Sequence, residues 1–359
     1  MGSGPTTRAA EQGGEPRRPG RLALADYVAG VRAGDRATLA RAITLVESEL
    51  PRDRELAHAL LDAIYPATGG AHRVGVTGVP GVGKSTFIEA IGTYLTGHGH
   101  KVAVLAVDPS STRTGGSILG DKTRMPRLAR DPAAFVRPSP THGALGGVAR
   151  HTREAMLLCE AAGFDVALIE TVGVGQSEVV VAELVDTFVA LMLAGAGDEL
   201  QGIKRGLLEV VDLLVIHKAD GENLGPARAA QAEYRSALRL LRGREAREVP
   251  VLACSSLPDA NAAGGAVADV WRAIVEHRAQ AERSGALARR RREQRGRALW
   301  RAIEDELRAR FREHPTVAAR LPALEAAVAA GQTSPERAAE ALLSAFASAG
   351  EGADEPRPA

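Results

Sequence analysis

The sequence has little of several things, and each shortage excludes a class of protein. Only two of its 359 residues are cysteines, Cys159 and Cys254, so it lacks the disulfide framework of small secreted domains, and a reducing, cytoplasmic location is expected. No apolar run approaches the roughly 20 residues of a membrane-spanning helix, and no N-terminal segment resembles a signal peptide. The formal net charge of +1 argues against a chain-wide attraction to nucleic acid or anionic membrane. We therefore expect a globular protein with neither a nucleic-acid nor a membrane partner.

Lysine is scarce as well, since only five of the 45 basic residues are lysines. In a chain so biased toward arginine, lysine is expected to persist where a compact ammonium on a slim stem is required. Two of the five, Lys84 and Lys218, fall in the two motifs described below. Simple sampling of so few residues is the alternative explanation.

Composition and periodicity divide the chain into five segments. Residues 1–21 are rich in Gly, Pro and Arg, and residues 350–359 are polar, so both are expected to be disordered tails. Apolar residues at helical spacing predict two or three helices over residues 22–71. Residues 72–278 alternate short apolar runs with helical stretches, which predicts an α/β domain with a mostly parallel sheet flanked by helices. Residues 279–349 are predicted to form a C-terminal helical region.

The first part of that region is crowded with arginine, including Arg289–Arg292. Trp300, Ile303, Leu307 and Phe311 nevertheless mark one helical face. A basic run with an aromatic residue is one pattern of nucleic-acid binding. The acidic residues nearby favour instead a long surface helix with solvated arginines, whose apolar stripe packs on another helix, from this chain or from a second subunit.

A phosphate-binding motif stands near the start of the α/β domain. The stretch RVGVTGVPGVGKST holds Gly-x-x-x-x-Gly-Lys-Ser, the complete Walker A pattern. Its glycines let backbone N–H groups curl around phosphate oxygens, and the helix that follows offers its positive N-terminus. Lys84 can reach the β- and γ-phosphates, and the Ser85 hydroxyl can ligate magnesium. The motif predicts that a nucleoside triphosphate contacts Gly78, Val79, Pro80, Gly81, Val82, Gly83, Lys84, Ser85 and Thr86.

Carboxylates that hold magnesium are expected where the strands of such a sheet end. Asp108 follows the apolar run KVAVLAV, and Glu170 follows DVALI. Glu170 opens the sequence Glu-Thr-Val-Gly, which is similar to the Asp-x-x-Gly switch of GTPases, where the glycine N–H, here that of Gly173, senses the γ-phosphate. Asp121, in GDKTRM, is a weaker candidate that fits a loop or helix-capping role equally well. Ser85 and these three carboxylates make up the predicted Mg²⁺ site.

A second motif, HKAD, follows the apolar run DLLVI, at a point where many guanine-nucleotide proteins have Asn-Lys-x-Asp. Asp220 can accept hydrogen bonds from N1 and N2 of guanine, and Lys218 can lay its stem along the base. The imidazole of His217 can donate only once, so it keeps part of the asparagine's role and should affect affinity and loop rigidity more than base choice. Ser255 and Ser256, after VPVLAC, fit the last base-contacting loop. The expected ligands are GTP and GDP.

Together these stretches make the sequence similar to the methylmalonyl-CoA mutase-associated GTPases of the MeaB or ArgK type. The resemblance runs from about Ala25 to Phe346, and its most specific parts are GVPGVGKST, AVDPSS with SILGDKTRM, ETVGVGQSE, and GAGDELQGIK before HKAD. It implies a dimeric P-loop GTPase that gates adenosylcobalamin loading into, and protection of, a cobalamin-dependent acyl-CoA mutase, with methylmalonyl-CoA mutase as the leading partner. It also implies that the C-terminal helices form a dimerisation arm. The implied switch loop, which would relay the nucleotide state to the partner, contains Gly195, Asp198, Glu199, Gln201 and Lys204.

Two residues depart from the family's pattern: His217 replaces the usual Asn, and Ser256 stands where Ala is usual. Lys84 and Gly173 are the expected catalytic groups around the γ-phosphate. No glutamine directly follows Gly173, since Gln176 comes three residues later. Slow intrinsic hydrolysis that a partner accelerates is therefore expected.

Three other functions remain open at this point. A metal-delivery GTPase chaperone shares the nucleotide core but normally adds metal ligands, and the nine histidines form no Cys/His cluster in the sequence. An ArgK-type kinase acting on amino-acid transport components would use ATP, which the guanine motif disfavours. A small-molecule kinase would need an Arg-rich lid closer to the phosphate motif than the arginines of this chain.

Overall fold

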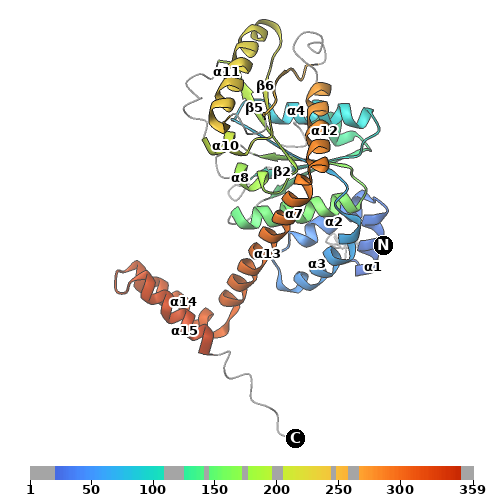
Figure 1. The fold of residues 1–359 in the computed structure, drawn as a ribbon. Helices are drawn as coiled ribbons and strands as arrows, with labels where there is room; N and C mark the ends of the chain where they lie inside the picture. The colour runs from blue at the N-terminus through green and yellow to red at the C-terminus, as the bar shows by residue number, and fades with distance from the viewer. Residues whose placement is uncertain are drawn as a thin grey trace, which may run out of the picture.

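The computed structural model describes residues 21–108, 125–140, 145–171, 177–195, 205–243, 248–257 and 267–348. These residues form a seven-stranded, fully parallel sheet with the strand order β3-β2-β4-β1-β5-β6-β7 (Figure 1). The strands are β1 (His72–Gly78), β2 (Val102–Asp108), β3 (Ala134–Pro140), β4 (Val166–Thr171), β5 (Thr187–Leu193), β6 (Leu213–His217) and β7 (Val251–Cys254). The predicted α/β fold is confirmed.

One strand was not expected from the sequence. Strand β3 reads AFVRPSP, with an arginine and two prolines, so it lacks the apolar run that marks the other six. Its place in the sheet explains this composition, because β3 lies at one edge. An edge strand tolerates proline, since one side of its backbone needs no ladder partner.

Side chains alternate between two apolar layers, as a two-residue strand period requires. On β4, Val166 and Leu168 face one layer, whereas Ala167 and Ile169 face the other. The first layer is covered by α4 (Lys84–Gly97), α6 (Pro126–Arg130) and α12 (Val267–Arg283). The second is covered by α7 (Leu145–Ala161), α8 (Ser177–Ala182), α10 (Arg205–Val210) and α11 (Leu224–Arg242).

The N-terminal segment forms three helices, α1 (Leu24–Arg32), α2 (Arg36–Val46) and α3 (Pro51–Ile64). Helix α2 begins after Asp35, whose carboxylate accepts a hydrogen bond of 2.7 Å from the backbone N–H of Thr38. Buried Leu39 and Ile43 belong to the same apolar cluster as residues of α7. These helices therefore extend the second layer away from the sheet.

The C-terminal region is an arm that leaves the α/β domain (Figure 1). Helix α12 continues past the predicted division at residue 279, and α13 (Ala286–Glu313) begins after Gly285, which has a left-handed φ of 70°. Helices α14 (Pro315–Ala329) and α15 (Pro335–Ser348) pack on each other at the end of the arm. The ring centroids of Phe311 and Phe346 lie 5.5 Å apart, and this contact packs α15 against the end of α13.

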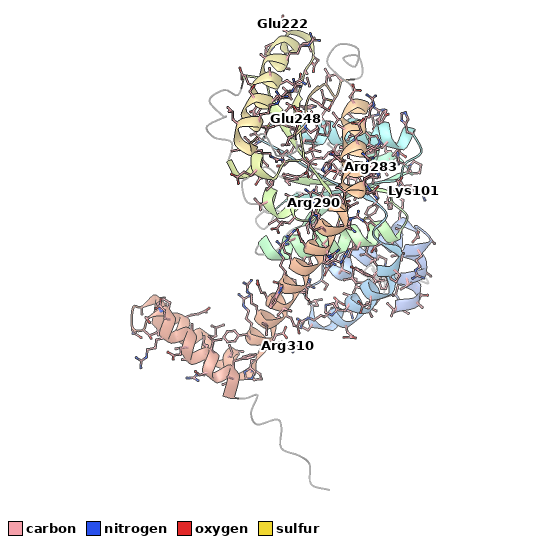
Figure 2. All side chains as sticks on the ribbon, in the orientation of Figure 1. Lys101, Glu222, Glu248, Arg283, Arg290 and Arg310 are labelled. Carbon is pink, nitrogen blue, oxygen red and sulfur yellow. The ribbon has the colours of Figure 1, made fainter. Side chains whose placement is uncertain are left out.

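The prediction that the arginines at the start of α13 are simply solvated is wrong for two of them. Arg290 forms two hydrogen bonds, of 2.9 and 3.1 Å, with the carboxylate of Asp212, just before β6. Arg291 binds both oxygens of Asp186, just before β5, at 2.9 and 2.6 Å. These forked pairs fix the root of the arm to the amino ends of two strands, and Figure 2 shows Arg290 at this root and Arg310 farther along the helix.

The outer part of α13 exposes the predicted apolar face. Trp300 is 66% exposed, and Leu299 and Leu307 are more than half exposed. Within the single chain this part of the face therefore has no packing partner among the described residues. Among all the residues that the structure describes, no helix is long and apolar enough to cross a membrane.

Candidate nucleotide site

The Walker A residues form the turn between β1 and α4, at the carboxyl edge of the sheet. At two positions there, close contacts leave no room for a side chain. At Gly78 an added Cβ would lie 2.4 Å from the carbonyl oxygen of Leu191, and at Gly83, where φ is 95°, it would lie 2.9 Å from Cε1 of His217. The turn therefore packs closely against β5 and the HKAD motif. The next residue, Lys84, is the first residue of α4.

Lys84, the first residue of α4, folds its side chain back into this turn. Its Nζ donates to the carbonyl oxygens of Gly78 at 2.7 Å and Val79 at 3.2 Å. Burial lowers the pKa of Lys84, and the carboxylates of Glu170 and Glu178 oppose that effect. When a nucleotide binds, the ammonium can exchange these two carbonyl oxygens for phosphate oxygens. It lies beside the positive N-terminus of α4, where an anion is favoured.

Ser85 and Glu170 meet at the same edge of the sheet. The Ser85 hydroxyl donates to Oε1 of Glu170 at 2.8 Å, and Glu170 is 8% exposed. Below them, Thr171 on β4 donates to Thr77 on β1 at 2.8 Å, in a fully buried bond. A hydroxyl and a carboxylate are oxygen ligands of the kind that Mg²⁺ prefers, so this pair fits a magnesium ion held directly or through water.

The HKAD motif follows β6 and lies against the Walker A turn. The ammonium of Lys218 donates to the carbonyl oxygen of Gly81 at 3.0 Å. Lys218 has a φ of 57°, the left-handed conformation, and its own carbonyl accepts a bond of 2.6 Å from Nδ2 of Asn223. A non-glycine residue in this conformation costs free energy, so a surrounding structure must hold it. Asn223, which the sequence motifs did not single out, supplies part of that support.

Asp220 and the loop after β7 are also joined. The Ser255 hydroxyl donates to Oδ1 of Asp220 at 2.8 Å, and the backbone N–H of Ala219 donates to the carbonyl oxygen of Cys254 at 3.1 Å. The second carboxylate oxygen of Asp220, Oδ2, takes no part in the hydrogen bond with Ser255. The two stretches predicted to contact the base are therefore neighbours, and one hydroxyl orients the carboxylate that would read it.

Both ring nitrogens of His217 are engaged by the protein. Nδ1 lies 2.7 Å from the carbonyl oxygen of Val82, and Nε2 lies 2.7 Å from the hydroxyl of Ser256. In the usual motif the asparagine amide ties this loop to the Walker A turn and donates to N7 of the base. The bond from His217 to Val82 supplies the tie. Donation to N7 would require one of the two bonds of the ring to break.

Several predicted site residues fall outside the described residues. They are Asp121, Gly173, Asp198, Glu199, Gln201 and Lys204. Asp108 ends β2, but its side chain is likewise outside, and Gly195 lies just past the end of β5 with a φ of 81°. Among the described residues, no group of three or more His, Cys, Asp or Glu side chains is placed to hold a metal ion. Of the predicted magnesium ligands, the structure thus brings together Ser85 and Glu170.

Comparison with known proteins identifies the family. The model of the family described as "Methylmalonyl Co-A mutase-associated GTPase MeaB" matches residues 39–316. The chain belongs to the MeaB family. A probable GTPase of Mycobacterium tuberculosis is 55% identical over 314 residues, which cover 87% of this chain and 92% of that protein.

Two further comparisons carry names that bear on function. The mouse protein named methylmalonic aciduria type A homolog, mitochondrial, is 49% identical over 89% of this chain and 78% of its own length. The crystal structure described as an LAO/AO transport system kinase superposes with a TM-score of 0.67 at 41% identity, covering 89% of this chain and 96% of that one. The protein is therefore a P-loop GTPase that binds GTP and GDP.

Proposed function

We propose that this GTPase binds GTP with Mg²⁺ and uses its hydrolysis to gate adenosylcobalamin loading into, and protection of, an acyl-CoA mutase. The observation that carries the nucleotide part is the direct joining of the HKAD motif to the Walker A turn through Lys218 and Gly81. This contact supports one pocket that holds phosphates and base together. The mutase part rests on the name of the family whose model matches the chain.

The residues take the following roles in this proposal. The Walker A turn, residues 78–86, holds the phosphates, and Lys84 with Gly173 stabilises the charge that develops on the γ-phosphate as water attacks in line. Ser85 and Glu170, with Asp108 and Asp121, would hold a magnesium ion, whose charge would further neutralise the phosphates. Lys218 and Asp220 bind guanine with their side chains, and Ser255 and Ser256 belong to the loop whose backbone contacts the base. The stretch from Gly195 to Lys204 couples the nucleotide state to the partner.

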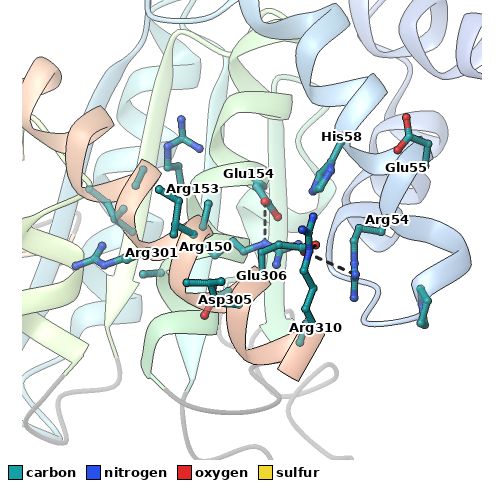
Figure 3. A pocket seen from close by; sticks show the side chains of 18 of the residues that line it. Arg54, Glu55, His58, Arg150, Arg153, Glu154, Arg301, Asp305, Glu306 and Arg310 are labelled. Carbon is teal, nitrogen blue, oxygen red and sulfur yellow. Dashed lines mark hydrogen bonds and ion pairs between the residues drawn. The ribbon is translucent and has the colours of Figure 1, made fainter. Parts of the chain in front are cut away.

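The proposed dimer rests on the exposed face of α13. Leu299, Trp300 and Leu307 present a row of apolar side chains on a helix that otherwise carries many charges. Beside this face a hollow of about 810 Å³ lies between α3, α7 and α13, and Figure 3 shows arginine and glutamate side chains from all three helices around it. A second copy of the chain is the proposed occupant, because an apolar stripe beside charges of both signs can pack against the same surface of another copy, with an apolar core and a polar rim.

The dimer is tested by light scattering after gel filtration. Trp300→Glu should shift the protein toward the monomer, because it places a charge in the apolar contact. Leu240→Glu is the matched control, since Leu240 is 86% exposed on α11, away from the arm. A monomeric parent protein, or a W300E variant that dimerises as well as the parent, contradicts the proposal.

The mutase partnership is tested by sedimentation of the GTPase with a cobalamin-dependent acyl-CoA mutase from the same source. The proposal predicts a complex whose stability differs between GDP and a non-hydrolysable GTP analogue, because the nucleotide must change the affinity to act as a gate. Absence of a complex with methylmalonyl-CoA mutase and with related acyl-CoA mutases would refute the partner assignment while leaving the GTPase assignment intact.

A kinase function has one observation in its favour, because the similar solved structure is described as a transport system kinase. The HKAD motif opposes it, because the carboxylate of Asp220 can accept hydrogen bonds from the two hydrogens that guanine has and adenine lacks in that arrangement. Selective phosphorylation of a protein substrate by ATP would favour the kinase function.

A further inference from the structure

The two residues that depart from the usual guanine-loop pattern are in direct contact. His217 stands in place of Asn and Ser256 in place of Ala, and 39 positions separate them in the sequence. In the fold, Nε2 of His217 lies 2.7 Å from the Ser256 hydroxyl oxygen. Considered separately, each departure only changes the usual motif, whereas in the fold the two side chains are hydrogen-bond partners.

The ring's other bond fixes the direction of this contact. The carbonyl oxygen of Val82 can only accept, so Nδ1 of His217 carries the proton of that 2.7 Å bond. Burial lowers the pKa of His217, and the bond to Val82 opposes that effect, so the ring is neutral near pH 7. In a neutral ring Nε2 is then an acceptor, and the Ser256 hydroxyl donates to it.

Ser256 matters because the histidine ring is almost completely buried. His217 is 2% exposed, and its ring lies nearly perpendicular to that of Phe87, with the ring centroids 5.9 Å apart. Without Ser256 the lone pair of Nε2 would lose its donor in a place that water reaches poorly. A buried acceptor left without a donor costs more free energy than the average hydrogen bond contributes.

An asparagine at position 217 would not need this serine. Its amide carries two polar atoms on Cγ, at the positions that Nδ1 and Cδ2 occupy in histidine. One of them can donate to the Val82 carbonyl as Nδ1 does, but the side chain ends before the position of Nε2. The imidazole extends farther, and the atom at its far end requires a partner.

We propose that His217 and Ser256 act as one hydrogen-bonded unit that replaces the asparagine and makes Ser256 a positioning residue for guanine-nucleotide binding. The unit links three segments: the Walker A turn at Val82, the end of β6, and the loop after β7. Through it the loop that carries Ser255, the residue that orients Asp220, is fixed relative to the phosphate-binding turn. This proposal rests on the nucleotide site and is independent of the mutase.

The test is a double-mutant cycle on nucleotide affinity. The Kd for GDP carrying a fluorescent group on its ribose is measured for the parent protein, Ser256→Ala, His217→Asn and the double variant. Ser256→Thr keeps the hydroxyl and serves as the conservative variant. Ser236→Ala is the matched control, because its hydroxyl bonds a helix carbonyl on the exposed side of α11. Melting temperatures without nucleotide verify that each variant is folded.

The proposal predicts that S256A raises the Kd about fivefold or more when position 217 is His, and less than about twofold when it is Asn. S256T and S236A should stay within about twofold of the parent. An equal effect of S256A in both backgrounds would overturn the proposal, since Ser256 would then act without His217. No effect in either background would overturn it as well, because the contact would contribute nothing to nucleotide binding.

Discussion

The hydroxyl of Ser85 donates a 2.8 Å hydrogen bond to the carboxylate of Glu170, although 85 positions separate the two residues in the sequence. Ser85 belongs to the Walker A turn and Glu170 to the end of β4. The parallel pairing of β1 with β4 brings them together, with Val76 opposite Glu170 in the register. A magnesium ion bound at this point would be held by groups from both motifs.

Replacing Glu170 with Gln should raise the Mg²⁺ concentration needed for half-maximal GTP hydrolysis by about 10–100-fold, because the amide lacks the carboxylate's charge. A titration of hydrolysis rate against Mg²⁺ measures this. Glu248→Gln, which changes an exposed surface pair with Arg239, should leave the titration unchanged. An unaltered Mg²⁺ requirement in E170Q would remove Glu170 from the metal site.

Lys84→Ala should lower kcat/KM for GTP by about 100-fold or more, since it deletes the charge aimed at the phosphates. Steady-state hydrolysis assays measure the loss. Lys101→Ala is the matched control, because Lys101 is exposed and precedes β2. Comparable activity of K84A and K101A would show that the buried ammonium has no part in the reaction.

Asp220→Asn should exchange a preference for guanine for one for xanthine, because the amide can donate to the xanthine oxygen where the carboxylate accepted from guanine. Competition of GTP, XTP and ATP for binding measures the change. The affinity for ATP should not rise, since adenine gains no partner from the substitution. A D220N variant that still prefers GTP would show that this loop does not read the base.

Asp212→Asn should destabilise the protein without abolishing nucleotide binding. Asp212 holds the arm at the amino ends of the strands, whereas the Walker A turn lies at their carboxyl ends. Breaking a buried ion pair costs about 3–5 kcal/mol, and since the Arg290 side chain is 36% exposed we expect on the order of 2 kcal/mol. Thermal melting measures it. Asp269→Asn, which changes an exposed pair with Arg272, should have little effect.

The same pair predicts a dependence on pH. Burial raises the pKa of Asp212, but hydrogen bonds from His277 and Arg290 outweigh that effect and hold the pKa well below its usual range. The stabilisation is therefore complete above about pH 4, the ordinary value of the unfolded group, and is lost as the pH falls toward the folded-state pKa. Between pH 5 and 2 the melting temperature of the parent should fall more steeply than that of D212N, and parallel curves would contradict this account.

Much of the fold could be predicted because the apolar runs of six strands and the Walker A pattern are local signals. Strand β3 was missed since its edge position relaxes the rule that central strands obey. The pairing of Arg290 and Arg291 with two aspartates could not be predicted, because it depends on where the start of α13 meets the amino ends of the strands. For the same reason, the sequence showed His217 and Ser256 as two separate departures and could not show that they touch.

The most direct test of the proposed function is hydrolysis of GTP and ATP by the purified protein, side by side, with and without a cobalamin-dependent acyl-CoA mutase from the same source. The account predicts slow hydrolysis that is selective for GTP and that rises when the mutase is added. A preference for ATP, or a GTPase rate that no such mutase changes, would contradict it.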